Sequence, residues 1–431
     1  MNTKREIRQY RGILLTCFFI MFASYGSLSS FAIYVPEFAE GVHSSVALVG
    51  LIAGIYGGAC VVFGLLVDKV LKSMGLMAAA LVGAFSQVVS YLCYALATHI
   101  VVLYIGGIIG ALGMAVGTMT LCATIIEQWF PANHEKKFAV VCSGTGIGAA
   151  FWILFDGATI TLFGYRISYV IMCVLIVIMV VPLSLIFIKT PESAGIQPCM
   201  EGNDSKQKKE NVRVYGEEAS HIYKSASFWL TMIGMIGVGY LNMTFESYAP
   251  AFWQENGIST MTSSVLLCMY YIVGALTTVI AGKIAKKYKS RIYITVLCVA
   301  FTIGVLLLSI WGMHISMVIL LLSVFMMACS YALYSNVPGT VTAELFGTRD
   351  YVKICTALTM GYSIGQFFGP LQFSATLAAT NSYVISYLTL ALAGALALVF
   401  CLVGFSMAIS AQKKKRSGNY SEDTLAESQN A

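Results

Sequence analysis

Long apolar stretches follow one another along almost the whole chain, and they constrain its fold more than any other feature. A helix that crosses the ~30 Å hydrocarbon core of a bilayer needs about 20 consecutive, mainly apolar residues. Twelve stretches meet this requirement. They cover residues 12–34, 46–67, 74–97, 100–126, 138–163, 167–188, 227–252, 262–282, 292–312, 315–338, 354–377 and 383–409.

Basic residues are distributed unevenly over the segments that connect these stretches. All but one of the 26 Lys and Arg residues lie at the two termini or in every second connection, and the exception is Arg166. An excess of Lys and Arg is typical of cytosolic loops. We therefore predict a multi-pass protein of the inner or plasma membrane, embedded in the lipid bilayer, with both termini in the cytosol.

Composition excludes several other classes of protein. The chain is 58% hydrophobic and 11% charged, whereas soluble domains have about 25% charged residues. Its net charge of +6 requires no nucleic-acid partner, because the basic residues lie in short loops where they set topology. Every cysteine except Cys199 lies singly within an apolar stretch, so we predict no disulfide and no metal site.

Motifs for catalysis are also missing from the sequence. Gly282 and Lys283 are followed by Ile rather than by the Ser or Thr of a phosphate-binding loop. His134 and Glu135 are not followed by a second histidine at metal spacing. We therefore predict no catalytic residues and no cofactor, and we do not expect an enzyme.

One long polar segment divides the chain. Residues 189–224 contain six basic and six acidic residues and almost no aliphatic run, which is typical of a solvated tether. The sequence thus predicts an all-α membrane protein of two six-helix bundles, which we expect to act as a monomer. The predicted parts are residues 1–188, the cytosolic linker 189–224, the second bundle 225–411 and a disordered tail 412–431.

The two halves resemble each other. The pattern Phe-x-x-Tyr-x-Pro-x-Phe begins at Phe31 in the first stretch and at Phe245 in the seventh, an offset of 214. The glycines at 144 and 148 match those at 361 and 365, an offset of 217. Six plus six spans in parallel repeats are the architecture of many transporters. The glycines four residues apart also let neighbouring helices pack closely, as static contacts or as rocking surfaces.

The segment after the second stretch resembles the loop signature of the major facilitator superfamily, Gly-x-x-x-Asp-Arg-x-Gly-Arg. Gly64 and Asp68 match it, Lys69 keeps its basic character, and Leu71 replaces its second glycine. In that family the loop acid lies at the cytosolic gate between the halves. The resemblance therefore implies a gate made by Gly64, Asp68 and Lys69 with Arg349, near the start of the eleventh span.

Within that superfamily, short motifs are similar to the branch of oxalate:formate antiporters and monocarboxylate transporters. They are Ser24–Gly26, Trp129–Pro131, Ser143–Gly148, Gly164–Arg166, Thr190–Glu192 and Phe368–Pro370. This branch usually carries a basic residue in the eighth helix to hold a carboxylate. Here residues 262–282 contain no charge, so the chain departs from the branch at that point.

Two acidic residues lie within predicted spans. Burying a charge in a bilayer costs at least about 2.5–3.5 kcal/mol, so intramembrane acids are candidates for a function. Glu246 has Ala32 as its counterpart in the first half, so the repeated packing does not require it. Glu246 and Asp156 are our candidates for a proton-coupling acid, and the alternative for each is a hydrogen-bonded structural acid.

Polar residues in the first, seventh and tenth spans are candidates for a substrate cavity. In the superfamily, helices 1, 4, 7 and 10 line the central cavity. Tyr331 and Tyr334 lie on one face of the tenth span, Tyr25 and Ser29 on one face of the first, and Asn242 in the seventh. Tyrosines near the ends of spans can instead lie at the membrane interface.

These observations favour secondary active transport of a small organic solute by alternating access. Our first hypothesis for the solute is an organic anion such as a monocarboxylate. A second hypothesis is proton-coupled antiport, or export, of a neutral or cationic compound, because two acids are buried and the eighth span has no base. A membrane sensor is a remote alternative.

Overall fold

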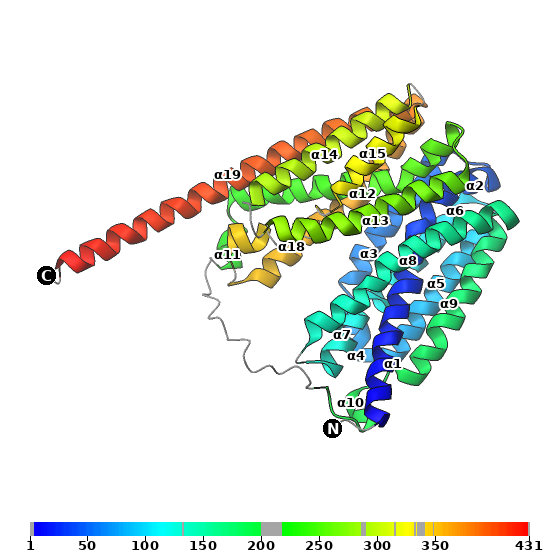
Figure 1. Ribbon diagram of the computed structural model, residues 1–431, viewed down its shortest axis with the longest axis horizontal. Coiled ribbons are helices and arrows are strands. Elements are labelled where there is room, and N and C mark those ends of the chain that lie inside the picture. The colour runs from blue at the N-terminus through cyan, green and yellow to red at the C-terminus, as the bar shows by residue number, and fades with distance from the viewer. Residues whose placement is uncertain are drawn as a thin grey trace.

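The chain is an all-helical membrane protein of two helical bundles, described from a computed structural model (Figure 1). The structure describes residues 4–131, 133–199, 218–285, 290–313, 316–331, 333, 341–347 and 349–429. The side chains at 68, 135, 279, 281–285, 290–293, 343, 351–352 and 411–429 are not described.

The first bundle contains the helices up to α9. They are α1 (Lys4–Ile20), the π-helix η1 (Met21–Tyr25), the 3-10 helix η2 (Gly26–Ser30), α2 (Phe31–Gly41), α3 (Val46–Gly64), α4 (Val67–Met74), α5 (Leu76–Leu96), α6 (Ile100–Gly117), α7 (Met119–Trp129), α8 (His134–Phe163) and α9 (Tyr165–Phe187).

The remaining helices belong to the linker and the second bundle. They are α10 (Pro191–Ala194), α11 (Ala219–Ile222), α12 (Ala226–Glu255), α13 (Thr260–Ala285), α14 (Ser290–Trp311), α15 (Met317–Cys329), the π-helix η3 (Thr342–Phe346), α18 (Tyr351–Thr380) and α19 (Tyr383–Gln429).

The helices follow the order of the predicted spans and are consistent with their number. Ten helical segments of the described residues are long and apolar enough to cross a membrane. The shorter α15 and the 30-residue α18 occupy the positions of the tenth and eleventh predicted spans. Within a bilayer only a helix satisfies all backbone polar groups of a single segment, which explains why these apolar stretches are helical.

Two predicted spans are interrupted. The first contains η1 and η2 between α1 and α2. The fourth breaks at Thr118, which has φ −126° and ψ −107° and donates a hydrogen bond from Oγ1 to the Met114 carbonyl at 2.6 Å. Beside this break, a side chain at Gly83 of α5 would overlap the backbone of Gly117 of α6. The two helices α5 and α6 therefore lie too close together for any larger residue at this contact.

Hydrogen bonds between described residues join the two bundles near one end of the molecule. We call the end that carries Lys4, Lys136 and Lys189 the basic end of the molecule. Near the opposite end, the Ala47 carbonyl of α3 accepts hydrogen bonds from the hydroxyl groups of Tyr248 at 3.2 Å and Ser374 at 2.6 Å.

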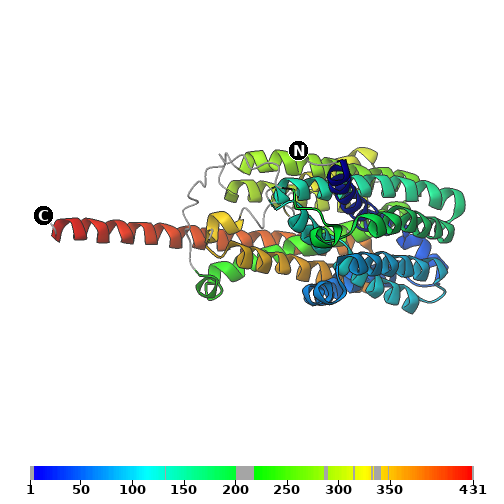
Figure 2. The same cartoon turned by 90° about the horizontal axis from the view of Figure 1, so that it is seen from below.

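Towards the basic end the bundles diverge, as Figure 1 shows, and in Figure 2 the last helix α19 extends beyond the rest of the molecule. Gly54 and Gly58 of α3 still lie against Phe367 of α18. Gly64, at the last residue of α3, has no atom within 4 Å of the position that a side chain would take, and Leu65 is 69% exposed. The structure is therefore closed at the opposite end and open at the basic end.

The two ends of the linker are attached to different bundles, which corrects our expectation of a solvated tether for those parts. Residues 189–199 lie on the first bundle: the Trp129 indole donates to the Lys189 carbonyl at 2.8 Å, and the Tyr10 hydroxyl donates to the Gln197 carbonyl at 2.6 Å. Both aromatic side chains are buried, and they contact each other edge to face. Residues 200–217 lie outside the described part of the chain.

The start of α11 is attached to the second bundle. Asp350 accepts a hydrogen bond from the Ala219 amide at 2.9 Å, and Arg349 forms an ion pair with Glu218 at 2.6 Å. The Ala219 amide and the nearby Lys353 hold the pKa of Asp350 below its ordinary value. This attachment is therefore present above the ordinary pKa of an aspartate and is lost only when the pH falls through the lowered value.

The last helix is longer than expected. Residues 412–431 were predicted to form a disordered tail, whereas α19 continues to Gln429 (Figure 1). The sequence after Lys413 contains no proline and several good helix formers, including Lys, Gln, Glu, Ala and Leu. The absence of proline is compatible with a continued helix, and Gly418 and Asn419 are the residues in this segment that commonly end one.

Candidate functional site

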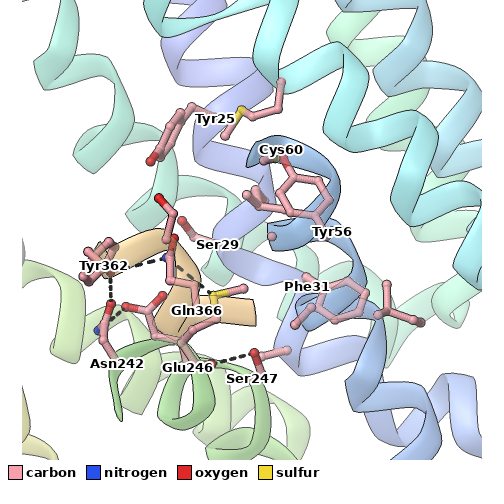
Figure 3. Close-up of a pocket in the computed structure, with 18 of the residues that line it drawn as sticks. Tyr25, Ser29, Phe31, Tyr56, Cys60, Asn242, Glu246, Ser247, Tyr362 and Gln366 are labelled. Carbon is pink, nitrogen blue, oxygen red and sulfur yellow. Dashed lines mark hydrogen bonds between the residues drawn. The ribbon is translucent and has the colours of Figure 1, made fainter. Parts of the chain in front are cut away.

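A cavity of about 320 Å³ lies between the two bundles. Its walls come from the first membrane helix and from α3, α5, α6, α12, α13 and α18, together with Tyr331. The lining residues are Tyr25, Leu28, Ser29, Phe31, Ala32, Ile52, Ala53, Tyr56, Gly57, Cys60, Val61, Tyr94, Met114, Asn242, Met243, Glu246, Ser247, Tyr271, Tyr331, Tyr362, Ser363 and Gln366. Figure 3 shows the side chains that project into it.

Most of the polar groups belong to the second bundle and form one hydrogen-bonded network (Figure 3). Asn242 donates from Nδ2 to Oε1 of Glu246 at 2.9 Å, one helical turn further along α12. Its Oδ1 accepts a hydrogen bond from the Tyr362 hydroxyl at 2.7 Å, and Gln366 contacts the same hydroxyl at 3.4 Å. Asn242 thus connects the carboxyl group on α12 to the polar face of α18.

Tyrosine rings surround this network on its other side. The Tyr270 hydroxyl lies 2.8 Å from Nδ2 of Asn242 and 3.3 Å from Oε1 of Glu246. Its ring packs edge to face against Tyr271 and Tyr331, with centroids 5.3 and 5.6 Å apart. The electron-rich faces of such rings can contact apolar or cationic groups of a ligand.

The wall from the first bundle is mainly apolar. Leu28, Ile52 and Met114 face the cavity there, with Tyr25 and Ser29 of the first helix and the ring of Tyr56. The two walls therefore differ, because one offers hydrogen-bonding groups and the other offers apolar surface.

The described lining of the cavity contains an acidic side chain and no basic side chain. Among the described residues that line it, Glu246 is the single acid, and none is Lys, Arg or His. Glu246 is partly exposed to the cavity, whereas Asn242 is 7% exposed. The described part of the chain also holds no group of three or more His, Cys, Asp and Glu side chains that could bind a metal.

The structure brings most of the predicted cavity residues together. Tyr25, Ser29, Asn242 and Tyr331 line the cavity, as does the acid Glu246. Tyr334 lies outside the described residues.

Asp156 lies elsewhere. It is fully buried inside the first bundle, where Ser30 contacts its Oδ2 at 2.5 Å, and it does not line the cavity.

The residues of the predicted gate are separated from one another where the structure describes them. Gly64 has no close neighbour and Lys69 is exposed, while Arg349 is paired with Glu218 of its own half. The side chain of Asp68 lies outside the described part. The structure therefore shows no contact between the halves at these described residues.

Sequence reasoning missed most of the other lining residues, among them Tyr56, Tyr362 and Gln366. These three come from α3 and α18, which we had not expected to line the cavity. A signal was present, since Gln366 is a rare amide within an apolar span and Tyr362 precedes it by one helical turn.

Two helical bundles that enclose a shared cavity are typical of a membrane protein of the transporter class. The sequence model of the Major Facilitator Superfamily matches residues 17–370, and the chain belongs to this family.

Solved structures are similar in fold. A mutant of the nucleoside transporter NupG has a TM-score of 0.71 at 14% identity, covering 92% of this chain and 99% of that one. A bacterial homologue of the human lysosomal transporter Spinster, in its inward-facing and occupied conformation, has a TM-score of 0.66 at 15% identity, covering 96% and 98%. Its inward-facing, unoccupied conformation gives 0.67 at 14% identity, with the same coverage. A comparison with curated protein sequences gives no match.

Proposed function

We propose that this protein is a secondary active transporter that moves a small organic solute by alternating access. Its family and its fold support a transporter rather than an enzyme. The two bundles touch near one end of the cavity and diverge at the other. Rocking of one bundle against the other would close the open end and open the closed end around a fixed site.

We further propose that the basic end faces the cytosol, in an inner or plasma membrane, so that this conformation is inward-facing. The rocking units would be residues 1–188 and 225–411, joined by 189–224. One chain supplies the whole cavity wall, which supports a monomer. Single cysteines at positions 43 and 257 should react from outside and one at 72 from the cytosol. Reaction of position 72 from outside would overturn this orientation.

The observation that carries our proposal for the solute class is the carboxyl group of Glu246 in a described lining without any base. An organic anion placed there would meet a like charge and find no cation to compensate its own. The geometry therefore supports a neutral or cationic solute over the organic anion suggested by the family resemblance.

The same carboxyl group supports coupling to protons. When the cavity is open, water and the donors Asn242 and Tyr270 can solvate an ionised Glu246. When the cavity closes and loses its water, the charge must be compensated by a proton or by a cationic group of the solute. A proton and the solute would then compete for one carboxylate, which is the basis of antiport.

Counterflow in proteoliposomes tests the solute class directly. The panel should contain solutes that share one body and differ in the head group, for example tyramine, tyrosol and 4-hydroxyphenylacetate. We expect exchange of amines or neutral solutes, and we expect carboxylates to exchange poorly. Exchange restricted to carboxylates would contradict the proposal.

A further inference from the structure

The first membrane helix changes its hydrogen-bond pattern twice beside the cavity. In η1 the Gly26 amide donates to the Met21 carbonyl, five residues back, and after η2 the Phe31 amide donates to the Leu28 carbonyl, three residues back. A regular α-helix would join residues four apart at both places. Such irregular turns inside a helix are frequent at functional sites.

This irregular segment decides which side chains reach the cavity. A 3-10 helix has three residues per turn, so Ser27 and Ser30 of η2 align on one face, and the Ser27 hydroxyl contacts the carbonyl of Ser24 in η1. All three are buried in the first bundle, whereas Tyr25 and Ser29 line the cavity. A change of this segment to regular α-helix would rotate Tyr25 and Ser29 relative to their present positions.

Two side chains of α8, one helical turn apart, contact the two ends of the irregular segment. Trp152 donates from Nε1 to the Phe22 carbonyl at 3.0 Å, the carbonyl that the Gly26 amide would bond in a regular helix. Asp156 contacts the Ser30 hydroxyl at 2.5 Å. Both α8 side chains are fully buried, so neither contact competes with water.

The two contacts of the Ser30 hydroxyl favour a proton on Asp156. Its Oγ lies 2.5 Å from Oδ2 of Asp156 and 2.8 Å from the Ser27 carbonyl. A serine hydroxyl has one proton and cannot donate to both oxygens. Both contacts are hydrogen bonds only when Asp156 carries a proton and donates it to Ser30, which then donates its own to the Ser27 carbonyl.

The surroundings of Asp156 agree with a neutral carboxylic acid. The titratable groups that face it are the phenols of Tyr34 on α2, Tyr91 on α5 and Tyr169 on α9. No Lys, Arg or His is among the described groups around it, and its Oδ1 has no hydrogen-bond partner in the described part of the chain. A buried carboxylate without a cation would be far less stable than a neutral acid.

We propose that Trp152 and the protonated Asp156 form a clamp that holds the irregular segment of the first helix, so that Tyr25 and Ser29 point into the cavity. Asp156 is then a positioning residue rather than a group that binds the solute. The clamp concerns the shape of the cavity, so it stands or falls independently of the solute and of the role of Glu246.

The labelling of a cysteine at position 29 tests the clamp. Full-length protein carrying Ser29→Cys is placed in lipid nanodiscs and treated with N-ethylmaleimide, and site-resolved mass spectrometry measures the reaction rate. The native Cys60 lines the same cavity and is the internal reference. Opening or closing of the bundles changes both rates, whereas rotation of the first helix changes the ratio of the rate at position 29 to the rate at Cys60.

Asp156→Ala, Ser30→Ala and Trp152→Phe should each lower this ratio about fivefold, as expected for the loss of one buried hydrogen bond. Asp156→Asn should keep the ratio within about twofold, because an amide can donate to Ser30 as the protonated acid does. An Asp156→Asn variant that behaves like Asp156→Ala would overturn the protonated clamp. Unchanged ratios in Ser30→Ala and Trp152→Phe would overturn the clamp even if Asp156→Ala does not fold.

Discussion

At the residue scale, the chemistry of the cavity depends on Asn242. It donates to Glu246, accepts from Tyr362 and lies beside the Tyr270 hydroxyl, so one amide connects three helices. Buried polar groups that are fully hydrogen-bonded favour one arrangement, and the loss of one partner leaves the others unsatisfied. The position of the carboxyl group of Glu246 is therefore determined by residues on α12, α13 and α18 together.

Replacing Tyr362 by phenylalanine should destabilise the protein. The substitution removes the donor to Oδ1 of Asn242 and leaves a buried acceptor unpaired, which costs about 1–3 kcal/mol. Thermal unfolding in detergent measures this. Tyr387→Phe is the matched control, because the buried Tyr387 hydroxyl has no hydrogen-bond partner among the described residues. Equal stability of the two variants would contradict the network.

Sequence patterns identified part of this site. Glu246 and Asn242 stood out because polar residues are rare in apolar spans, and Tyr25, Ser29 and Tyr331 followed from helical spacing. Tyr362 and Gln366 could not be assigned in the same way, because their role depends on how α18 packs beside α12. The contact of Asp156 with Ser30 depends on an irregular turn that hydropathy does not detect.

At the element scale, glycines place the two polar helices of the cavity in direct contact. A side chain at Gly365 of α18 would overlap the Ile236 carbonyl of α12, and one at Gly369 would overlap the Tyr240 carbonyl. On α12, Gly239 meets the Tyr362 carbonyl in the same way. The spacing of these glycines predicted close packing, and the structure shows which backbone groups they contact.

Gly365→Ala should lower the amount of folded protein and its thermal stability by roughly 1–3 kcal/mol, because the added methyl group forces α12 and α18 apart. Size-exclusion chromatography and thermal unfolding measure the effect. Gly146→Ala is the control, since a side chain there would meet no atom within 4 Å. If both variants are equally stable, close packing at Gly365 is not required.

The spans themselves were predictable, since hydropathy and the length of a membrane helix determine them. The breaks at Gly26 and Thr118 could not be predicted. They depend on backbone contacts of the first membrane helix with α8 and of α6 with α5. The same limitation applies to the linker, whose attached ends depend on contacts with individual residues such as Trp129 and Asp350.

At the scale of the whole molecule, the proposed mechanism makes this structure one state of a two-state cycle. The opposite end is closed by hydrogen bonds to Ala47, while Gly64 and Leu65 are free of the other bundle. A sequence encodes both states of such a cycle, so it could predict the two bundles but not which end is open. The proposed gate at Asp68 belongs to the state in which the basic end closes.

Asp68→Asn should slow transport about two- to fivefold while leaving the amount of folded protein unchanged, as expected for the loss of a carboxylate that stabilises a helix N-terminus across the closed gate. Counterflow rates and surface amount measure the two effects. Lys72→Gln in the same segment is the control for a change of charge alone. A wild-type rate in Asp68→Asn would show that the gate does not depend on this residue.

The central claim is that Glu246 couples the movement of solute to protons. The decisive measurement compares wild type with Glu246→Gln in proteoliposomes, using a solute identified by counterflow, with and without an imposed pH gradient. Glu255→Gln, on the same helix but outside the cavity lining, is the control. We predict that Glu246→Gln exchanges solute downhill but cannot accumulate it against its gradient, whereas the control does both. If Glu246→Gln accumulates solute as well as wild type does, the coupling group is another residue and the account is wrong.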